Sequence, residues 1–287
     1  MNVKENMEVL SYELAETDDA GGIIPDIEYF YKLVMQIKKV NRKYLSNHYL
    51  NEYVWAEAIS RGDVTYQYKK NEYLNLWWKK EHFRRLSYFI ANPYHYKVDD
   101  DPMTSVCDVI CKGSDLEDAC RMLSNAGMTQ YAVYEKWVNK NVVLSDLHSG
   151  NDLQIVDEDD GEIFIDKLYQ YFDKLSDLLP DEKEVDKFVK EKHFIGVHNK
   201  CDNMLVAGII YTKQGSVIKE EFIFVTAGCR GMGIGKLLIS TLYQRYADEK
   251  VRGTAWIRVD NLESIALHRA CYYEKQNQYK VTFIKKK

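Results

Sequence analysis

The sequence of 287 residues lacks any segment suited to a membrane or to secretion. No apolar run approaches the roughly 18 residues that a membrane helix needs, and the polar, acidic stretch 1–13 has no apolar core of a signal peptide. None of the six cysteines forms a C-x-x-C pair, and no histidine stands at metal-ligand spacing from them. We therefore expect a reduced, cytoplasmic protein that binds neither a metal nor a membrane.

An excess of positive charge is also lacking, since 39 Lys and Arg oppose 44 Asp and Glu. The net charge of −5 gives no case for nucleic-acid binding. The charges are unevenly spread, however. Residues 152–191 carry 5 Lys against 14 Asp or Glu, whereas residues 192–287 carry 16 Lys or Arg against 8 acidic residues. A basic C-terminal third suits an anionic ligand such as a nucleotide, although a solvated surface gives the same pattern.

Hydrophobic residues make up 46% of the chain, enough for one large core or two ordinary ones. A polar stretch at 145–151, which includes Gly150, marks the predicted boundary. The predicted domains are therefore 1–148 and 149–287.

Hydrophobic periodicity predicts a mixed α/β fold in both domains. After an irregular leader at 1–24, the expected N-terminal elements are helices at 27–37, 51–60 and 115–125 and strands at 65–68, 73–78, 83–90, 106–110 and 130–137. The expected C-terminal elements are strands at 153–156, 194–197, 204–211, 217–225, 254–259 and 279–284 and helices at 163–175, 182–190, 234–248 and 262–271. From residue 152 onward the predicted order is β-α-α-β-β-β-α-β-α-β.

A strand at 222–225 leads into a glycine-rich loop that opens a helix. Glycines 231, 233 and 235 permit positive φ and a close approach of the backbone to a ligand. The unpaired N–H groups at the start of a helix attract an anion such as a pyrophosphate. Arg230 and Lys236 add charge-assisted contacts.

Two nucleotide-binding motifs do not fit this spacing. A Walker loop requires Gly-Lys-Ser/Thr, but Leu237 follows Lys236. A dinucleotide fingerprint requires G-x-G-x-x-G, but these glycines are spaced by two. A purely structural role for glycines at a tight helix start stays open.

The run 225–238, with Arg230-Gly231-Met232-Gly233-Ile234-Gly235 at its centre, closely resembles the acetyl-CoA loop of the GNAT N-acyltransferase superfamily. A second family-like run, 260–268, follows at the expected distance, and the resemblance covers residues 152–287. It implies that acetyl-CoA binds as cosubstrate and that a primary amine attacks the acyl carbonyl directly in a ternary complex. It also implies the cofactor-binding residues Phe224, Val225, Arg230, Gly231, Met232, Gly233, Ile234, Gly235, Lys236 and Asn261.

The expected catalytic residues are His268 and Glu221. His268 takes the place of the family's usual tyrosine acid; a His packed on the helix face without a catalytic role is the alternative. Strict strand alternation puts Glu221 on the face of Ile223 and Val225, which favours it as the base over Glu220, a water relay, or a merely solvent-facing carboxylate. Cys229 is a poor candidate nucleophile, because no His partner is evident.

The sequence departs from the family pattern after the last helix, and the first half of the chain matches the family only loosely. Tyr272 and Tyr273 replace the usual Gly-Phe and are expected to alter the turn after the last helix. Residues 27–140 repeat the rough element order without a glycine loop, which indicates a degenerate GNAT-like domain or an unrelated α+β domain.

The leading functional hypothesis is an N-acetyltransferase acting on a small-molecule or peptide amine; a homodimer is left open. A catalytically weak or inactive CoA-binding protein is the chief alternative. A tandem GNAT-like protein that uses aminoacyl-tRNA is a third, which the CoA loop and the net charge argue against.

Overall fold

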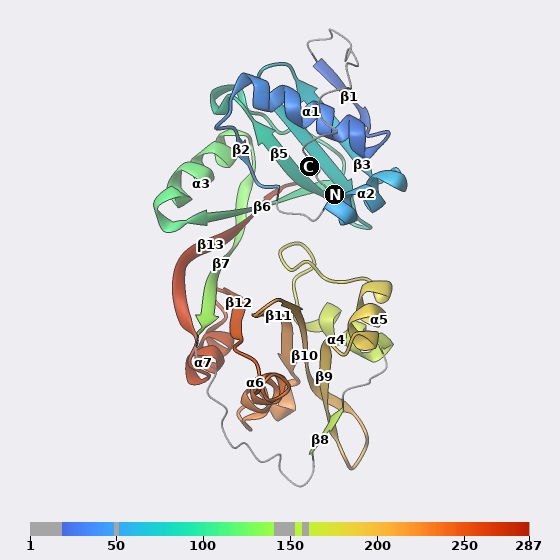
Figure 1. The fold of residues 1–287 in the computed structure, drawn as a ribbon, viewed down its shortest axis with the longest axis vertical. Helices are drawn as coiled ribbons and strands as arrows, with labels where there is room; N and C mark the ends of the chain where they lie inside the picture. Colours follow the sequence, from blue (N-terminus) through green and yellow to red (C-terminus); the bar gives the residue numbers. More distant parts are fainter. Residues whose placement is uncertain (1–18, 49–51, 141–152, 157–160, 287) are drawn as a thin grey trace. The chain divides into compact units, whose positions relative to one another are not determined.

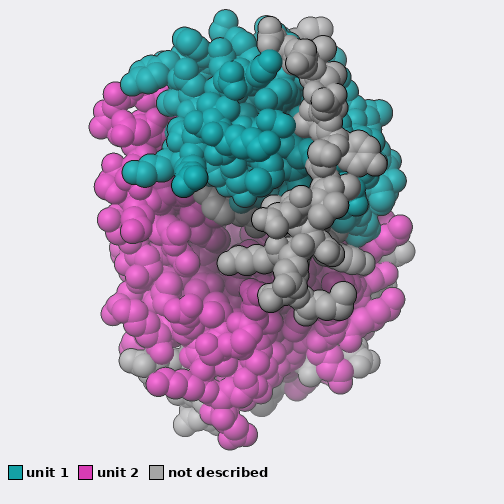
Figure 2. All heavy atoms as spheres, turned by 45° about the horizontal axis from the view of Figure 1, so that its top comes forward, with its two compact units in different colours: residues 1–107, 125–128, 285–287 teal, residues 108–124, 129–284 magenta. Residues whose placement is uncertain are grey.

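The computed structural model describes residues 19–48, 52–140, 153–156 and 161–286. The chain divides into two compact units (Figure 2). The first comprises residues 1–107, 125–128 and 285–287, and the second comprises residues 108–124 and 129–284. The predicted boundary between 148 and 149 falls within 141–152, outside the described residues, so it stays a prediction.

The first unit is a mostly antiparallel sheet covered by two helices (Figure 1). Its strands follow the order β1-β3-β4-β5-β6, β2 pairs with β5, and the β5–β6 pair is parallel. Its core joins Phe30 and Leu33 of α1 to Trp55 of α2 and Leu74 of β4. The elements are β1 (Asp19–Ile23), α1 (Ile27–Val40), β2 (Leu45–Ser46), α2 (Glu52–Ser60), β3 (Val64–Lys69), β4 (Tyr73–Lys79), β5 (Phe83–Ile90), the 3-10 turn Pro93–His95 and the start of β6 (Thr104–Lys112).

The predicted N-terminal helices and strands are confirmed, with one error in the leader. Residues 19–23 form β1, whose Ala20 and Gly21 pair with Tyr68 and Gln67 of β3. The sequence did not predict β1, because a Gly-rich edge strand has no alternating apolar side chains and is held by backbone pairing alone. Asp26 caps α1, accepting a hydrogen bond from the Tyr29 backbone N–H at 2.7 Å.

In the second unit the strands follow the order β13-β7-β12-β11-β10-β9-β8, and the β11–β12 pair is parallel. The mixed, mostly antiparallel α/β class is confirmed, as is the predicted element order from residue 152. The elements are the 3-10 turn Gly113–Asp115, α3 (Leu116–Asn125), β7 (Thr129–Asn139), β8 (Leu153–Val156), α4 (Gly161–Tyr171), α5 (Glu182–Lys190), β9 (Phe194–Asn199), β10 (Leu205–Gln214), β11 (Val217–Val225), the 3-10 turn Ala227–Cys229, α6 (Ile234–Gln244), β12 (Arg252–Arg258), α7 (Leu262–Ala270) and β13 (Glu274–Lys285).

β7 precedes the predicted boundary in sequence, yet it pairs within the second unit. Its Trp137 stands opposite Ala255 of β12 and Lys275 of β13, antiparallel to both strands. The sheet that holds β11 and β12 is therefore completed by a strand from the first half of the chain.

The two faces of this sheet are covered by different helices (Figure 1). Leu238 and Leu242 of α6 pack on Ile209 of β10. Phe164 of α4 packs on Ile210, the next residue of β10, because neighbouring strand residues point to opposite faces. No helix in the described parts of the chain combines the length and apolar content that a membrane crossing requires.

Candidate active site

The parallel strands β11 and β12 separate in the middle of the sheet. In the described residues their pairing runs only from Val217–Arg252 to Glu220–Ala255. Beyond this point a cavity of about 840 Å³ opens, lined by residues 222–225 of β11 and 256–258 of β12. The separation leaves one edge of the β11 backbone without a β12 partner and places it beside the cavity, where it can bind an extended ligand.

The glycine loop forms the end of this cavity and leads into α6. Gly231 and Gly233 adopt φ values of 77° and 81°, where a side chain would be strained. A Cβ on either glycine would meet no atom within 4 Å, so the space above them is open. Gly233 is the N-cap of α6 and offers no side chain to the first-turn N–H groups. The first-turn N–H groups of α6 therefore face open space without a side-chain cap.

Gly235 differs from the other two glycines. Its φ is not positive, and a Cβ there would lie 2.9 Å from Cδ2 of Leu267 on α7. It lines the cavity, but its lack of a side chain serves the close packing of α6 against α7.

Arg230 spans the mouth of the loop. Its Nε donates to the Val225 carbonyl oxygen at 3.2 Å, and its guanidinium lies 3.5 Å from the Glu263 carboxylate. The guanidinium also lies over the Tyr171 ring, 6.0 Å from the centroid. This half-exposed cation is therefore held at the junction of β11, α4 and α7.

Almost all of the predicted cofactor-binding residues line this one cavity. The exception is Met232, whose side chain is 67% exposed and lies outside the lining. Asn261 serves first as the N-cap of α7, because its Oδ1 accepts from the Ser264 N–H at 3.0 Å. Its amide NH₂ is then the part that can donate to a ligand. The residues that line the cavity are Phe224, Val225, Arg230, Gly231, Gly233, Ile234, Gly235, Lys236 and Asn261.

His268 is buried and held by two protein groups. Its Nδ1 lies 2.7 Å from the Ser264 carbonyl oxygen, one turn earlier in α7. Its Nε2 lies 3.0 Å from Oε2 of Glu220 on β11, and both side chains are only 2% exposed. Both residues line the cavity. The His268 side chain therefore meets a carboxylate in the cavity wall, and that carboxylate is Glu220.

The expectation that Glu221 lies on the same face of the strand as Ile223 and Val225 is wrong, because a bulge interrupts β11. Ile210 of β10 pairs with Phe222 and Tyr211 pairs with Glu220, so Glu221 is the extra residue. After the bulge, Ile223 packs against the core cluster that contains Tyr243 of α6. Glu220 meets Tyr243 on this same face of the sheet, so Glu220 takes the place that strict alternation gave to Glu221. The Glu221 carboxylate lies 2.6 Å from Lys219 Nζ and accepts from Thr212 Oγ1 at 3.0 Å. It lines the cavity, but an ion pair holds it.

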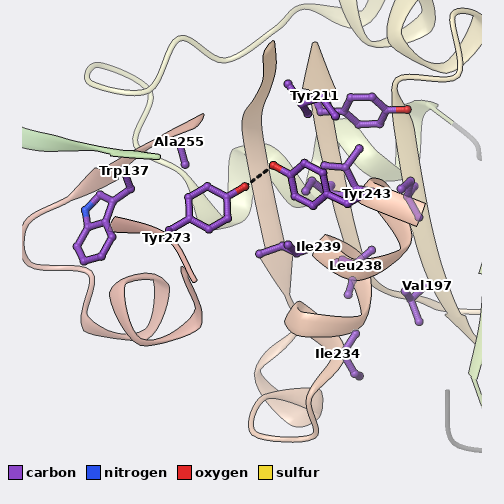
Figure 3. Close-up of a cluster of buried hydrophobic side chains, with 14 of the residues drawn as sticks. Trp137, Val197, Tyr211, Ile234, Leu238, Ile239, Tyr243, Ala255 and Tyr273 are labelled. Atoms are coloured by element: carbon purple, nitrogen blue, oxygen red, sulfur yellow. Dashed lines mark hydrogen bonds between the residues drawn. The ribbon is translucent and has the colours of Figure 1, made fainter. Parts of the chain in front are cut away.

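Two tyrosine hydroxyls complete the surroundings of Glu220. Tyr273 donates a short hydrogen bond to Oε1, and the Tyr243 hydroxyl lies 3.3 Å from the same oxygen. The two hydroxyls also contact each other (Figure 3). Burial, reinforced by the Glu220 charge, raises the pKa of both tyrosines well above the usual value, so both remain protonated donors.

Comparison with known proteins now identifies this half of the chain. Residues 153–272 match the model of the acetyltransferase (GNAT) family. The chain carries a GNAT domain.

Solved structures extend this likeness to nearly the whole chain. A tandem GNAT protein from the clavulanic acid biosynthesis pathway has a TM-score of 0.60 at 10% identity, covering 93% of this chain and 97% of that one. A GCN5-related N-acetyltransferase from Sphaerobacter thermophilus gives 0.57 at 8% identity, with 93% and 95% covered. A GNAT-family acetyltransferase from Colwellia psychrerythraea gives 0.53 at 12% identity, with 93% and 100% covered. No curated protein sequence matches the chain significantly. Such low identities show the fold, which is of the tandem GNAT kind.

The second unit also holds a polar cluster that the sequence did not single out. It lies at the connection after α4, where the Asp173 carboxylate accepts from the Tyr131 hydroxyl at 2.6 Å. Asp177 accepts from the Tyr134 hydroxyl at 2.8 Å. Tyr134 and both aspartates line the cavity. No local signal predicts this cluster, because the tyrosines lie on β7, about 40 residues before the aspartates.

Burial raises the pKa of Asp177, while hydrogen bonds from Tyr131 and backbone N–H groups outweigh burial at Asp173 and lower its pKa. Among the described residues of both units, no group of three or more His, Cys, Asp or Glu side chains is arranged to hold a metal ion.

Proposed function

We propose that this protein is an acyl-CoA-dependent N-acetyltransferase that transfers an acetyl group to a primary amine by direct attack in a ternary complex. The separation of β11 from β12 carries this proposal. It opens a cavity beside a glycine loop and leaves a strand edge unpaired between that loop and a buried carboxylate. The loop suits the anionic end of a ligand, the unpaired strand edge suits an extended arm, and the buried carboxylate lies where the reactive end of the ligand would reach.

The cavity residues fit acetyl-CoA part by part. The loop from Arg230 to Lys236, with the N-terminus of α6, would hold the pyrophosphate. The backbone of Phe224 and Val225 would bind the pantetheine arm, as an extra strand pairs with a sheet edge. Asn261, at the start of α7, would contact the arm near the thiol end. The fit is favourable because Gly231 and Gly233 keep the loop surface open.

The chemistry needs a group that takes a proton from the amine and one that gives a proton to the sulfur. The neutral amine attacks the thioester carbonyl, the C–S bond breaks, and the departing thiolate takes a proton. Glu220 is better supported than Glu221 as the proton-accepting carboxylate, since Glu221 is ion-paired to Lys219. His268, through its bond to Glu220, is the proposed source of the proton for the thiolate.

A CoA-binding protein without transferase activity is the second candidate. One observation favours it: both ring nitrogens of His268 are held by protein groups, which restricts direct proton delivery. We further propose a cytoplasmic location and a small-molecule or peptide acceptor, with no nucleic acid in the reaction.

Calorimetry with acetyl-CoA tests the binding site. Gly233→Glu introduces a negative charge into the pyrophosphate cradle, and we expect at least about a tenfold loss of affinity. Gly215→Glu is the matched control: Gly215 also has a positive φ and open space, but it lies in the β10–β11 turn, outside the cavity lining. Equal affinity of the Gly233→Glu variant and wild type would refute the loop assignment.

Thiol release from acetyl-CoA with a panel of primary amines then separates the two candidates. Turnover with any amine supports the transferase. Tight acetyl-CoA binding without turnover on small amines and peptide amines supports the inactive binder.

A further inference from the structure

The hydrogen bonds of His268 limit where its protons can be. The Ser264 carbonyl oxygen can only accept, so Nδ1, 2.7 Å away, must carry a hydrogen. The Ser264 hydroxyl is farther from Nδ1, at 3.3 Å. A contact of 3.0 Å between Nε2 and Glu220 Oε2 requires one more proton between them. His268 and Glu220 therefore share a single proton on the Nε2–Oε2 axis.

This shared proton has two possible places. On Nε2 it makes an imidazolium that faces a carboxylate. On Oε2 it makes a neutral imidazole that faces a carboxylic acid. Two charges with side chains only 2% exposed lose most of their hydration, which favours the neutral pair unless other groups stabilise the charges.

Tyr243 and Tyr273 supply that stabilisation at the other oxygen of the carboxylate. Both hydroxyls reach Oε1 of Glu220. A carboxylate that accepts donors at both oxygens is stabilised in its charged form. Because burial raises the pKa of both phenols, they donate rather than ionise.

The fold brings these groups together from β11, α6, β12, α7 and the turn that precedes β13. Tyr243 comes from α6, the helix that starts at the glycine loop, and Tyr273 lies directly before β13 (Figure 3). Gly253 of β12 leaves the space, since a Cβ there would overlap both hydroxyl oxygens. The Cys271 thiol also lies close enough to feel the carboxylate: burial and then the Glu220 charge raise its pKa to about 11, with Lys236 acting in the opposite direction. That thiol therefore carries no charge near neutral pH.

We propose that Tyr243 and Tyr273 are positioning residues that hold Glu220 as a carboxylate and thereby keep the shared proton on Nε2 of His268. This inference deepens the proposed function, on which its catalytic meaning rests. The ring is then an imidazolium that can pass its Nε2 proton to Glu220 as negative charge develops on the sulfur. Glu220, which lines the cavity, can deliver that proton to the thiolate, leaving a neutral ring and a carboxylate.

The location of the proton can be measured without any acceptor amine. Nitrogen-15 NMR of histidine-labelled protein distinguishes a ring nitrogen that carries hydrogen from one with a lone pair. His268→Gln assigns the signal among the seven histidines. At pH 7.5 we expect both nitrogens of His268 to carry hydrogen in wild type. In the Tyr243→Phe, Tyr273→Phe double variant we expect Nε2 to change to the lone-pair type.

Tyr211→Phe is the matched control. Tyr211 is a buried tyrosine of the same core, but its hydroxyl donates to the Lys192 carbonyl oxygen at 2.8 Å. This variant should leave the His268 signals unchanged. A lone-pair Nε2 in the wild type, or an unchanged signal in a folded double variant, would overturn the proposal. If the double variant does not fold, each single variant is measured, and a partial change in the same direction supports the proposal.

Kinetics give a second test, because a purely structural role of the two tyrosines would not change the pH dependence of turnover. With an amine found in the panel, Tyr273→Phe should lower kcat by about tenfold or more while KM for acetyl-CoA changes little. The low-pH limb of its kcat/KM profile should move upward by about one pH unit, since the carboxylate loses a donor. An unmoved profile would count against the proposal. Absence of turnover in wild type would instead refute the transferase function and leave the NMR result to decide the location of the proton.

Discussion

Gly253 of β12 lies against the hydroxyl of Tyr243, in the space that any side chain at this position would fill. Gly253→Ala must displace the hydroxyls of Tyr243 and Tyr273, both buried, or move the strand. We expect the free energy of unfolding to fall by about 1–3 kcal/mol, as for other overpacked cores. Urea unfolding at constant m-value measures the loss. Gly228→Ala is the control, since a Cβ there meets no atom within 4 Å. Equal losses in both variants would contradict the prediction.

Tyr272, next to this network, adopts a backbone conformation that favours glycine. Its φ is 62°, and the N–H of Tyr273 donates to the His268 carbonyl oxygen at 2.9 Å to close the end of α7. A tyrosine therefore occupies a left-handed position of this turn, and the expected alteration of the turn stays a prediction. Tyr272→Gly should therefore raise the free energy of unfolding by about 1 kcal/mol. Tyr272→Ala retains a Cβ and should bring no such gain, which thermal unfolding of the two variants can compare.

The sequence was informative where one segment determines its own structure. The elements around 27–37, 83–90 and 234–248 follow from apolar periodicity, and the loop at Arg230–Lys236 follows from glycine spacing and its neighbouring strand and helix. These features depend on neighbours a few residues apart, so they can be read locally.

The remaining features depend on contacts between distant segments. The bulge at Glu221 exists only in the pairing of β10 with β11, and strict alternation therefore chose the wrong face for that carboxylate. The pairing of β7 with β12 joins segments more than 100 residues apart. Tyr243 belongs to no recognisable motif, and Tyr273 stands at the aromatic position of the usual Gly-Phe pair, which gives no sign of the carboxylate that both tyrosines meet in space.

Cys271 reports on the charge of Glu220. Burial, followed by the Glu220 charge, raises the pKa of this thiol to about 11, whereas Lys236 lowers it. Because only the thiolate reacts, alkylation by iodoacetamide at pH 8 should be about a hundredfold slower than for an ordinary thiol. Glu220→Gln should speed the reaction and Lys236→Met should slow it, as followed by mass spectrometry of the Cys271 peptide. The exposed Cys201 serves as an internal reference. Rates that move together in the two variants would show that access, not charge, controls this thiol.

His48 of the first unit should make the stability of the protein fall in mild acid. Its ring lies among aromatic side chains, with centroids 5.0 Å from Trp55, 5.3 Å from Phe89 and 5.6 Å from Phe30. Burial lowers its pKa to about 4. The imidazole pKa in the unfolded chain is about 6.5. Between pH 4 and pH 6.5, roughly, the unfolded chain therefore binds a proton at His48 that the folded chain does not bind.

The contribution of His48 to stability is complete above pH 6.5 and is lost as the pH falls toward about 4. Urea unfolding followed by tryptophan fluorescence at pH 7.5, 6.0 and 5.0 measures this slope. His48→Phe keeps an aromatic ring in the cluster but removes the titrating group, so the slope should become shallower. His82→Gln, at a histidine whose side chain is 63% exposed, should leave the slope unchanged. If His48→Phe and wild type lose stability equally over this range, the acid sensitivity arises from other groups, and the desolvation of His48 does not control it.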